Sequence, residues 1–332
     1  MNAREQACWF ALVFQSKLPI RVINTILVTW CKQAGRTIED LFAAEAQEWA
    51  RVCHLTTEGL QKLEQARETI VAQSFLVEQL QHSGISVISV LDEQYPETLK
   101  LALDRNHIPP LLFYAGQLDI LKRQTVAIIG SRNANAESLH FTRLVARYLA
   151  EKNTNVISGF ARGVDRTAYE GATEADGPTT IVLPQGIRKL SRTQLRELQP
   201  RIEAGKVLLL SQFHPDAPWL VSRAMERNKV VTGLAQIVIV AESDTKGGTW
   251  EGANGALHQK RRVYVRATKD SSIPAGNAAL LEKGARPLSW SPSDEDQAFA
   301  PLLEKARKVQ EQQRSMPPSP RQLSLLAIEY KP

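Results

Sequence analysis

The chain has 332 residues, of which 43% are hydrophobic and 23% are charged. This length is typical of about two domains, and the hydrophobic fraction suffices for a sizeable core. The 41 Lys and Arg against 35 Asp and Glu give a formal net charge of +6, which permits a polyanionic partner without requiring one. Because no apolar run approaches the roughly 20 residues of a membrane helix and no cleavable-signal pattern opens the chain, we predict a cytoplasmic protein without membrane contact.

Residues 3–82 carry Ala, Gln, Glu and Leu at helical spacing, and the stretches TIED at 37–40 and TTEG at 56–59 are typical helix starts. We therefore predict a small all-helical N-terminal domain over residues 1–83. It has no Gly-rich helix-hairpin-helix turn, so we interpret it as a structural or dimerisation module. Its Cys8, Cys31 and Cys53 lack metal-ligand spacing, which favours packed thiols over a metal site.

A connector over residues 84–117 follows, with a strand at 84–91 and extended, proline-containing chain at 95–116. Beyond it, continuous apolar runs alternate with helical patterns, which indicates a parallel sheet covered on both faces. We predict a doubly wound α/β domain over residues 118–290. The six runs are TVAIIG (125–130), NVISG (155–159), TTIVLP (179–184), KVLLLSQF (206–213), QIVIVAE (236–242) and RVYVRA (262–267).

The remaining residues, 291–332, form a predicted tail with one helix at 298–313 and a short apolar segment, LSLLAIEY, at 323–330. A proline-rich break separates that segment from the helix. We expect the tail to be dispensable for folding and to contact a protein partner.

Three turns rich in small residues follow predicted strands, and ligands of open α/β sheets bind at the carboxyl ends of strands. Glycine lets the backbone approach an anion, helix starts offer N–H groups, and arginine and lysine add charge. We expect Asp165 to cap the helix after the second turn. The candidate residues are Gly130, Ser131 and Arg132 in the first turn, Ser158, Gly159, Arg162 and Gly163 in the second, and Lys246, Gly247, Gly248 and Thr249 in the third.

The spacing of these glycines matches neither the G-x-G-x-x-G fingerprint nor a Walker A loop, so neither NAD nor ATP hydrolysis is indicated. We predict no cofactor and no metal. Among the aromatic residues near the turns, Trp219 is a candidate for stacking on bases, whereas Phe213 is more typical of a core.

Several stretches resemble, in order, the motifs of the DprA/Smf family of DNA-processing proteins. They include VAIIGSR (126–132), VISGFARGVDRTAYEGA (156–172), RNKVVTGLA (227–235) and GGTWEGANGALHQKRRVYV (247–265). The resemblance implies an extended Rossmann-like core that binds single-stranded DNA, a homodimer, and delivery of DNA to a RecA-type recombinase, without enzymatic turnover. It adds Arg227, Asn228 and Lys229 to the candidate site.

The chain departs from the family pattern in three motifs. Tyr169 stands where the family usually has His, Lys229 replaces the last Arg of an Arg-Asn-Arg pattern, and residues 247–249 replace a Ser-Gly-Ser turn. We expect no winged-helix extension of the kind that some members carry.

Two alternatives remain open from the sequence. In the first, the chain is a DprA-like regulator or antitoxin of a phage-defence or toxin–antitoxin pair, and its apolar tail contacts the partner. In the second, it is a nucleotide-derivative sensor or a phosphoribohydrolase. In the second alternative Glu251, which follows the third turn, is a weak catalytic candidate. Because no second acid or base has matching spacing, we predict that the protein is not an enzyme.

Overall fold

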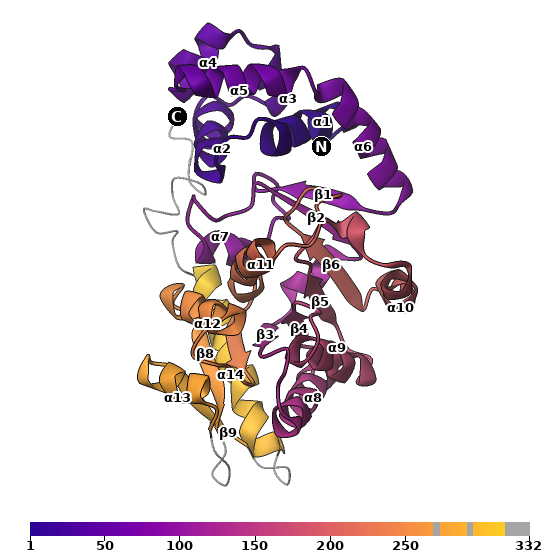
Figure 1. Ribbon diagram of the computed structural model, residues 1–332, viewed down its shortest axis with the longest axis vertical. Coiled ribbons are helices and arrows are strands. Elements are labelled where there is room, and N and C mark those ends of the chain that lie inside the picture. Colours follow the sequence, from indigo (N-terminus) through magenta and orange to yellow (C-terminus); the bar gives the residue numbers. More distant parts are fainter. Residues whose placement is uncertain (268–272, 291–294, 316–332) are drawn as a thin grey trace. The chain divides into compact units, whose positions relative to one another are not determined.

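The structure is a computed structural model that describes residues 1–267, 273–290 and 295–315. The chain divides into two compact units (Figure 1). The first consists of Met1–Tyr95 and Leu103–Phe113, and the second of Pro96–Ala102 and the described residues from Tyr114 onward. The apolar segment at 323–330 lies outside the described residues. No helix of the described ranges combines the length and apolarity required to cross a membrane.

The first unit is mainly helical, as predicted for the N-terminal region. The expected starts are confirmed: Thr37 caps α3 in a capping box with Asp40, and Thr56 caps α5. The helices are α1 (Ala3–Phe10), α2 (Ile20–Ile26), α3 (Ile38–Ala43), α4 (Ala46–Cys53), α5 (Thr57–Arg67) and α6 (Ile70–His82), and π-helical turns η1 (Ala11–Gln15) and η2 (Leu27–Gln33) extend α1 and α2.

Large aromatic side chains fill the core of this unit. Trp9, Trp30 and Trp49 are fully buried. All three cysteines are free, and burial raises the pKa of Cys8 to about 11 and that of Cys31 to about 12. Thiols with such pKa values stay protonated at neutral pH, so they act as small apolar groups rather than nucleophiles.

The connector contains the neighbouring strands β1 (Ser86–Ser89) and β2 (Leu111–Ala115). The extended conformation expected for residues 95–116 is wrong in part, because helix α7 (Glu97–Ala102) begins directly after Pro96. Proline blocks helix continuation but suits the start of a helix, where its missing N–H has no partner to lose.

Within the described residues, seven parallel strands form the sheet of the second unit, in the order β6-β5-β4-β3-β7-β8-β9. The six predicted runs are confirmed as β3 (Thr125–Ile129), β4 (Asn155–Ser158), β5 (Thr179–Val182), β6 (Val207–Ser211), β7 (Ile237–Val240) and β8 (Arg262–Ala267). A seventh strand, β9 (Arg286–Ser289), was not predicted, because it contains a proline and only one buried residue.

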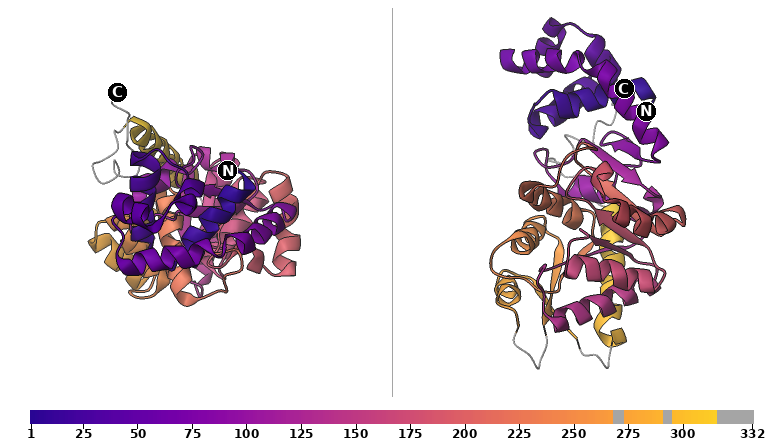
Figure 2. Two further views of the ribbon diagram at one scale, coloured as in Figure 1. Left: turned by 90° about the horizontal axis from the view of Figure 1, so that it is seen from above. Right: turned by 45° about the vertical axis from the view of Figure 1, so that its right-hand side comes forward.

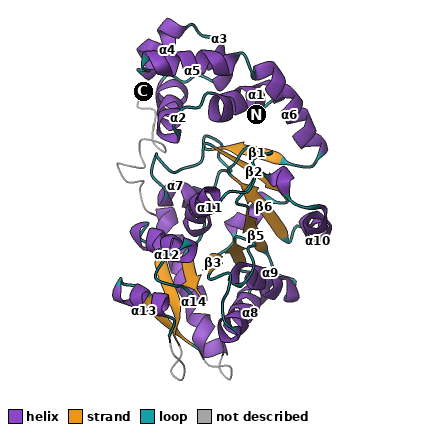
Figure 3. Cartoon of the chain, in the orientation of Figure 1, coloured by secondary structure: helices purple, strands orange, loops and turns teal. Residues whose placement is uncertain are grey.

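Helices cover both faces of this sheet, with α8, α9 and α10 on one side of the strands and α11, α12 and α13 on the other (Figure 3). The chain moves outward from β3 to β6 and then returns to place β7 against β3, so the strand order reverses at β3. The predicted doubly wound α/β fold is thereby confirmed. The helices are α8 (Ala136–Glu151), α9 (Val164–Glu174), α10 (Arg192–Glu203), α11 (Val221–Gly233), α12 (Gly248–His258) and α13 (Ala275–Glu282), with 3₁₀ turns η3 (Leu118–Lys122) and η4 (Ile187–Lys189).

The last described element, α14 (Glu295–Ser315), packs against α8 (Figure 2, right, in yellow). Its Phe299, Leu302 and Ala306 are buried in the same hydrophobic cluster as α8 and the central strands. The Phe299 ring lies edge-on to Phe141 and Tyr148, with centroids 6.1 Å and 5.6 Å apart. Our expectation that everything after residue 290 is dispensable for folding therefore does not fit α14, which belongs to the core.

Candidate anion-binding site

The first two turns contact each other through their backbones at the carboxyl edge of the sheet. The N–H of Val164 donates to the carbonyl of Ser131 (3.2 Å), and Gly163 has a φ of 84°. A Cβ on Gly163 would lie 2.4 Å from that same carbonyl oxygen, so only glycine fits there. A Cβ on Gly130 would likewise lie 2.4 Å from the Val164 side chain. The glycines thus allow the turns to pack together.

The start of α8, after the first turn, is occupied by a carboxylate of the chain itself. Asn135 caps the helix by accepting from the N–H of Ser138 (2.8 Å). Half-buried Glu242, from the segment after β7, accepts from the N–H of Asn135 (3.1 Å) and from the hydroxyl of Ser138 (2.6 Å). The expectation that this helix start presents free N–H groups to a ligand is therefore wrong for Asn135 and Ser138, whose N–H groups already donate to Glu242 and to the Asn135 side chain.

The second turn is closed in a similar way by Asp165. Its carboxylate accepts hydrogen bonds from the backbone N–H groups of Gly159 and Ala161, and burial raises its pKa. The expectation that Asp165 caps α9 is wrong. The N-cap is Gly163, and Asp165 lies inside the first turn of the helix. Its side chain therefore turns back toward the loop. It accepts hydrogen bonds from the N–H groups of Gly159 and Ala161, in the turn that we expect to hold a ligand.

The buried side chain of Arg227 packs against the second turn. Only 3% of it is exposed; its Nη1 donates to the carbonyl of Val182, and its Nη2 lies 3.9 Å from the Asp165 carboxylate. Burial lowers the pKa of Arg227, although the Asp165 charge opposes this shift. A Cβ on Gly159 would fall 1.9 Å from Nη1, so the guanidinium fills the space that this glycine leaves open.

The third turn keeps its helix start open. Gly247 has a φ of 87° and is the N-cap of α12, and no side chain of the described residues caps this helix. The N–H groups of its first turn, from Gly248 on, therefore remain available to an acceptor. Asn228 fixes the turn by donating from Nδ2 to the carbonyl of Gly248 (3.0 Å), and Lys246 stands exposed beside it.

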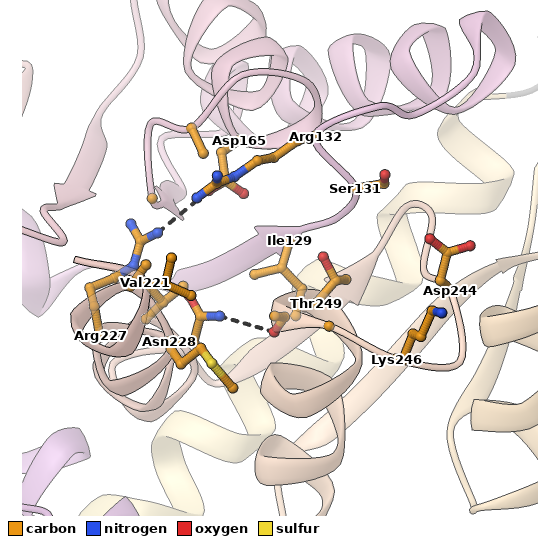
Figure 4. A pocket seen from close by; sticks show the side chains of 17 residues that line it. Ile129, Ser131, Arg132, Asp165, Val221, Arg227, Asn228, Asp244, Lys246 and Thr249 are labelled. Carbon is orange, nitrogen blue, oxygen red and sulfur yellow. Dashed lines mark hydrogen bonds and ion pairs between the residues drawn. The ribbon is translucent and has the colours of Figure 1, made fainter. Parts of the chain in front are cut away.

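A cavity of about 390 Å³ brings the three turns together with the start of α11 (Figure 4). Arg227 and Asn228 reach into it from α11, while Asp244 and Lys246 lie on the loop of the third turn (Figure 4). Nine of the candidate residues line it: Ser131, Arg132, Gly159, Arg227, Asn228, Lys246, Gly247, Gly248 and Thr249.

A second cavity, of about 540 Å³, shares Arg132, Gly159 and Arg227 with the first and adds Arg162. Arg162 donates to the side chain of Asn133 and is otherwise exposed. The other candidate residues line neither cavity: Gly130, Ser158, Gly163, Lys229 and Glu251. The glycines among them pack the turns, and the Ser158 hydroxyl donates to the carbonyl of Asp165 (3.2 Å).

Sequence reasoning missed several residues at the cavities. Phe160 and Gln185 line the second one, and Val221, Met225 and Asp244 line the first. Phe160 lies within the motif at 156–172, but its residue type did not single it out. The approach of all five side chains to the turns depends on the packed fold. The one available signal was the unusual density of apolar residues in the segment PWLV at 218–221.

A parallel sheet with helices on both faces and a reversal of strand order defines a Rossmann-like protein. The exposed arginines and the open helix start make its carboxyl edge a candidate anion-binding site. The family model described as DNA recombination-mediator protein A matches residues 86–296 of the chain. The chain belongs to this family, which confirms the resemblance seen in its motifs.

Two curated relatives illustrate the match. The chain is 31% identical over 199 residues to DNA processing protein DprA of Streptococcus pneumoniae, covering 60% of this chain and 69% of the relative. It is 31% identical over 200 residues to protein Smf of Escherichia coli K12, covering 60% of this chain and 52% of that protein.

Two solved structures are also similar. The X-ray structure of DprA from Streptococcus pneumoniae has a TM-score of 0.67 at 22% identity, covers 88% of this chain and 97% of that one, and supports the fold. DNA processing protein A from Helicobacter pylori, described for its single-stranded DNA binding mode, has a TM-score of 0.56 at 26% identity and covers 66% of this chain and 96% of that one.

Proposed function

We propose that the protein binds single-stranded DNA along the carboxyl edge of its sheet and acts in DNA processing during recombination. The observation that carries the proposal is the pair of cavities that share Arg132, with the open start of α12 and Lys246 on one side and Arg162 on the other. The single-stranded DNA binding described for the Helicobacter pylori relative supports it.

The distribution of charge favours a phosphate backbone over a dinucleotide cofactor. Glu242 and Asp165 already place carboxylates on N–H groups next to the first two turns, where a dinucleotide-binding protein would hold pyrophosphate. Arg132, Arg162 and Lys246 remain exposed. A strand that crosses both cavities would place successive phosphates near these three side chains, and such contacts carry little base specificity.

The test is the salt dependence of binding in the variant with Arg132→Ala and Arg162→Ala. The matched control carries Arg307→Ala and Lys308→Ala on α14, which removes the same charge from exposed side chains that line neither cavity. Each lost phosphate contact should flatten the slope of log K against log salt by about 0.7, so the site variant should lose about 1.4. Fluorescence anisotropy with labelled oligothymidine from low to moderate salt measures the slope.

The control should keep the wild-type slope, since long-range charge alone is screened within about 10 Å at 0.1 M salt. A site variant with wild-type affinity and slope, and with unchanged thermal unfolding, would place the DNA elsewhere. A wild-type protein without measurable affinity for oligothymidine would overturn the proposal as a whole.

We further propose that the protein is a homodimer and passes bound DNA to a RecA-type recombinase, as the family resemblance implies. Strand exchange by such a recombinase, with and without the protein, tests the second point, and no stimulation would contradict it. The hydrolase alternative gains no support from the geometry, because Glu251 is exposed and lines neither cavity. The regulator alternative rests on residues 323–330, outside the described residues.

A further inference from the structure

Four large apolar side chains, close together in the sequence, are exposed just before and within the first turns of α11. The exposed fractions are 45% for Trp219, 45% for Leu220, 63% for Val221 and 44% for Met225. Trp219 lines the second cavity, and Val221 and Met225 line the first. Large apolar side chains that are exposed together beside a cavity usually mark a binding site. Three of the four therefore lie at one cavity or the other.

Trp219 differs from most other tryptophans of the chain. Trp9, Trp30 and Trp49 are fully buried, and Trp290 is 9% exposed. By contrast, 45% of the Trp219 surface is exposed to water. The guanidinium carbon of Arg132 lies 5.6 Å from the centre of its ring. A cation–π contact of this kind holds Arg132 beside the indole, where the positive charge and the aromatic surface are presented together.

We propose that Trp219 is a stacking platform for a nucleobase of the bound strand, with the adjoining phosphate held by Arg132. This inference rests on the proposed single-stranded DNA binding and assigns the base-contacting residue. Nucleotides offer a flat apolar base and a phosphate within one repeat, which matches a half-exposed indole with a guanidinium at its side. Every base has a π face, so the contact tolerates all sequences.

The experiment combines protein variants with two kinds of strand. Trp219→Leu removes the aromatic ring, Trp219→Phe keeps a smaller ring, and Phe75→Leu on α6, where the side chain is 65% exposed, is the matched control for loss of an exposed aromatic. Each is titrated with oligothymidine and with an abasic strand of equal length, which keeps the phosphates but has no bases.

Trp219→Leu should weaken binding of oligothymidine by about 5- to 150-fold, the range for one lost base–aromatic stack. The abasic strand should bind Trp219→Leu and wild type about equally, and Trp219→Phe should lie between wild type and Trp219→Leu on oligothymidine. The salt slope should stay as in wild type, because stacking releases no counterions. Oligothymidine should also quench the tryptophan fluorescence of the wild type more than that of Trp219→Phe.

Equal losses on both strands, or a flattened salt slope in Trp219→Leu, would overturn the inference, because Trp219 would then act only by positioning Arg132. Wild-type affinity of Trp219→Leu for oligothymidine would overturn it as well. In all these cases wild-type binding of DNA persists, so the outcome is distinct from a failure of the proposed function, in which the wild type binds neither strand.

Discussion

Replacing Glu242 by alanine removes the carboxylate that fills the start of α8. Two donors then lose their acceptor: the N–H of Asn135, at 3.1 Å, and the hydroxyl of Ser138, at 2.6 Å. The positive end of the α8 dipole also loses its counter-charge. The structure thus predicts a protein that is less stable but has gained an anion site at the first turn.

The size of the effect follows from these contacts. Hydrogen bonds to a charged group contribute about 1.5–3 kcal/mol each, and a charge at a helix start about 0.3–1 kcal/mol. Since Glu242 is half-buried and water replaces part of what is lost, we expect the free energy of unfolding to fall by about 2–3 kcal/mol. Inorganic phosphate at ten times its Kd should return about 1.4 kcal/mol.

Urea unfolding of wild type and Glu242→Ala, each with and without phosphate, measures both quantities. Samples with chloride at the same ionic strength control for charge screening. The wild type with phosphate controls for the general stabilisation of folded proteins by this ion. Equal stabilisation of both proteins by phosphate would refute the reasoning, because the start of α8 would then not be a site that Glu242 keeps filled. An unchanged stability of Glu242→Ala without phosphate would refute it too.

Two further predictions concern the core and the assembly. Phe299→Ala should lower the free energy of unfolding by about 3–5 kcal/mol, as expected for a fully buried ring, and thermal unfolding that stays at the wild-type midpoint would contradict the packing of α14. The proposed homodimer predicts a light-scattering mass of two chains at micromolar concentration, whereas a mass of one chain would reject it.

The strands and turns could be predicted from the sequence because their signals are local. The continuous apolar run of residues 237–240 has no polar face, and a strand without one must be buried on both sides. The glycines of the turns are equally local, since Gly163 and Gly247 each adopt a positive φ. Such features depend on a residue and its neighbours in the chain, which are visible without the fold.

The partners within the site were not predictable in the same way. Glu242 reaches a helix start more than 100 residues earlier in the chain, and Arg227 looks from the sequence like an ordinary charge on a polar helix. Its burial depends on Gly159, whose missing Cβ makes room for the guanidinium. When each segment of the sequence is considered alone, both side chains are assigned to solvent or to a ligand. Their actual partners lie in distant segments of the chain.

The position of α14 has a consequence for how the chain is synthesised. The apolar face formed by α8 and the central strands is translated well before Phe299, Leu302 and Ala306, which cover it in the finished fold. Until the ribosome has released these residues, a large hydrophobic surface is open on the nascent chain, and such surfaces favour aggregation and chaperone binding. Premature termination between β9 and α14 should therefore produce a chain that has all its strands but is cleared by proteases.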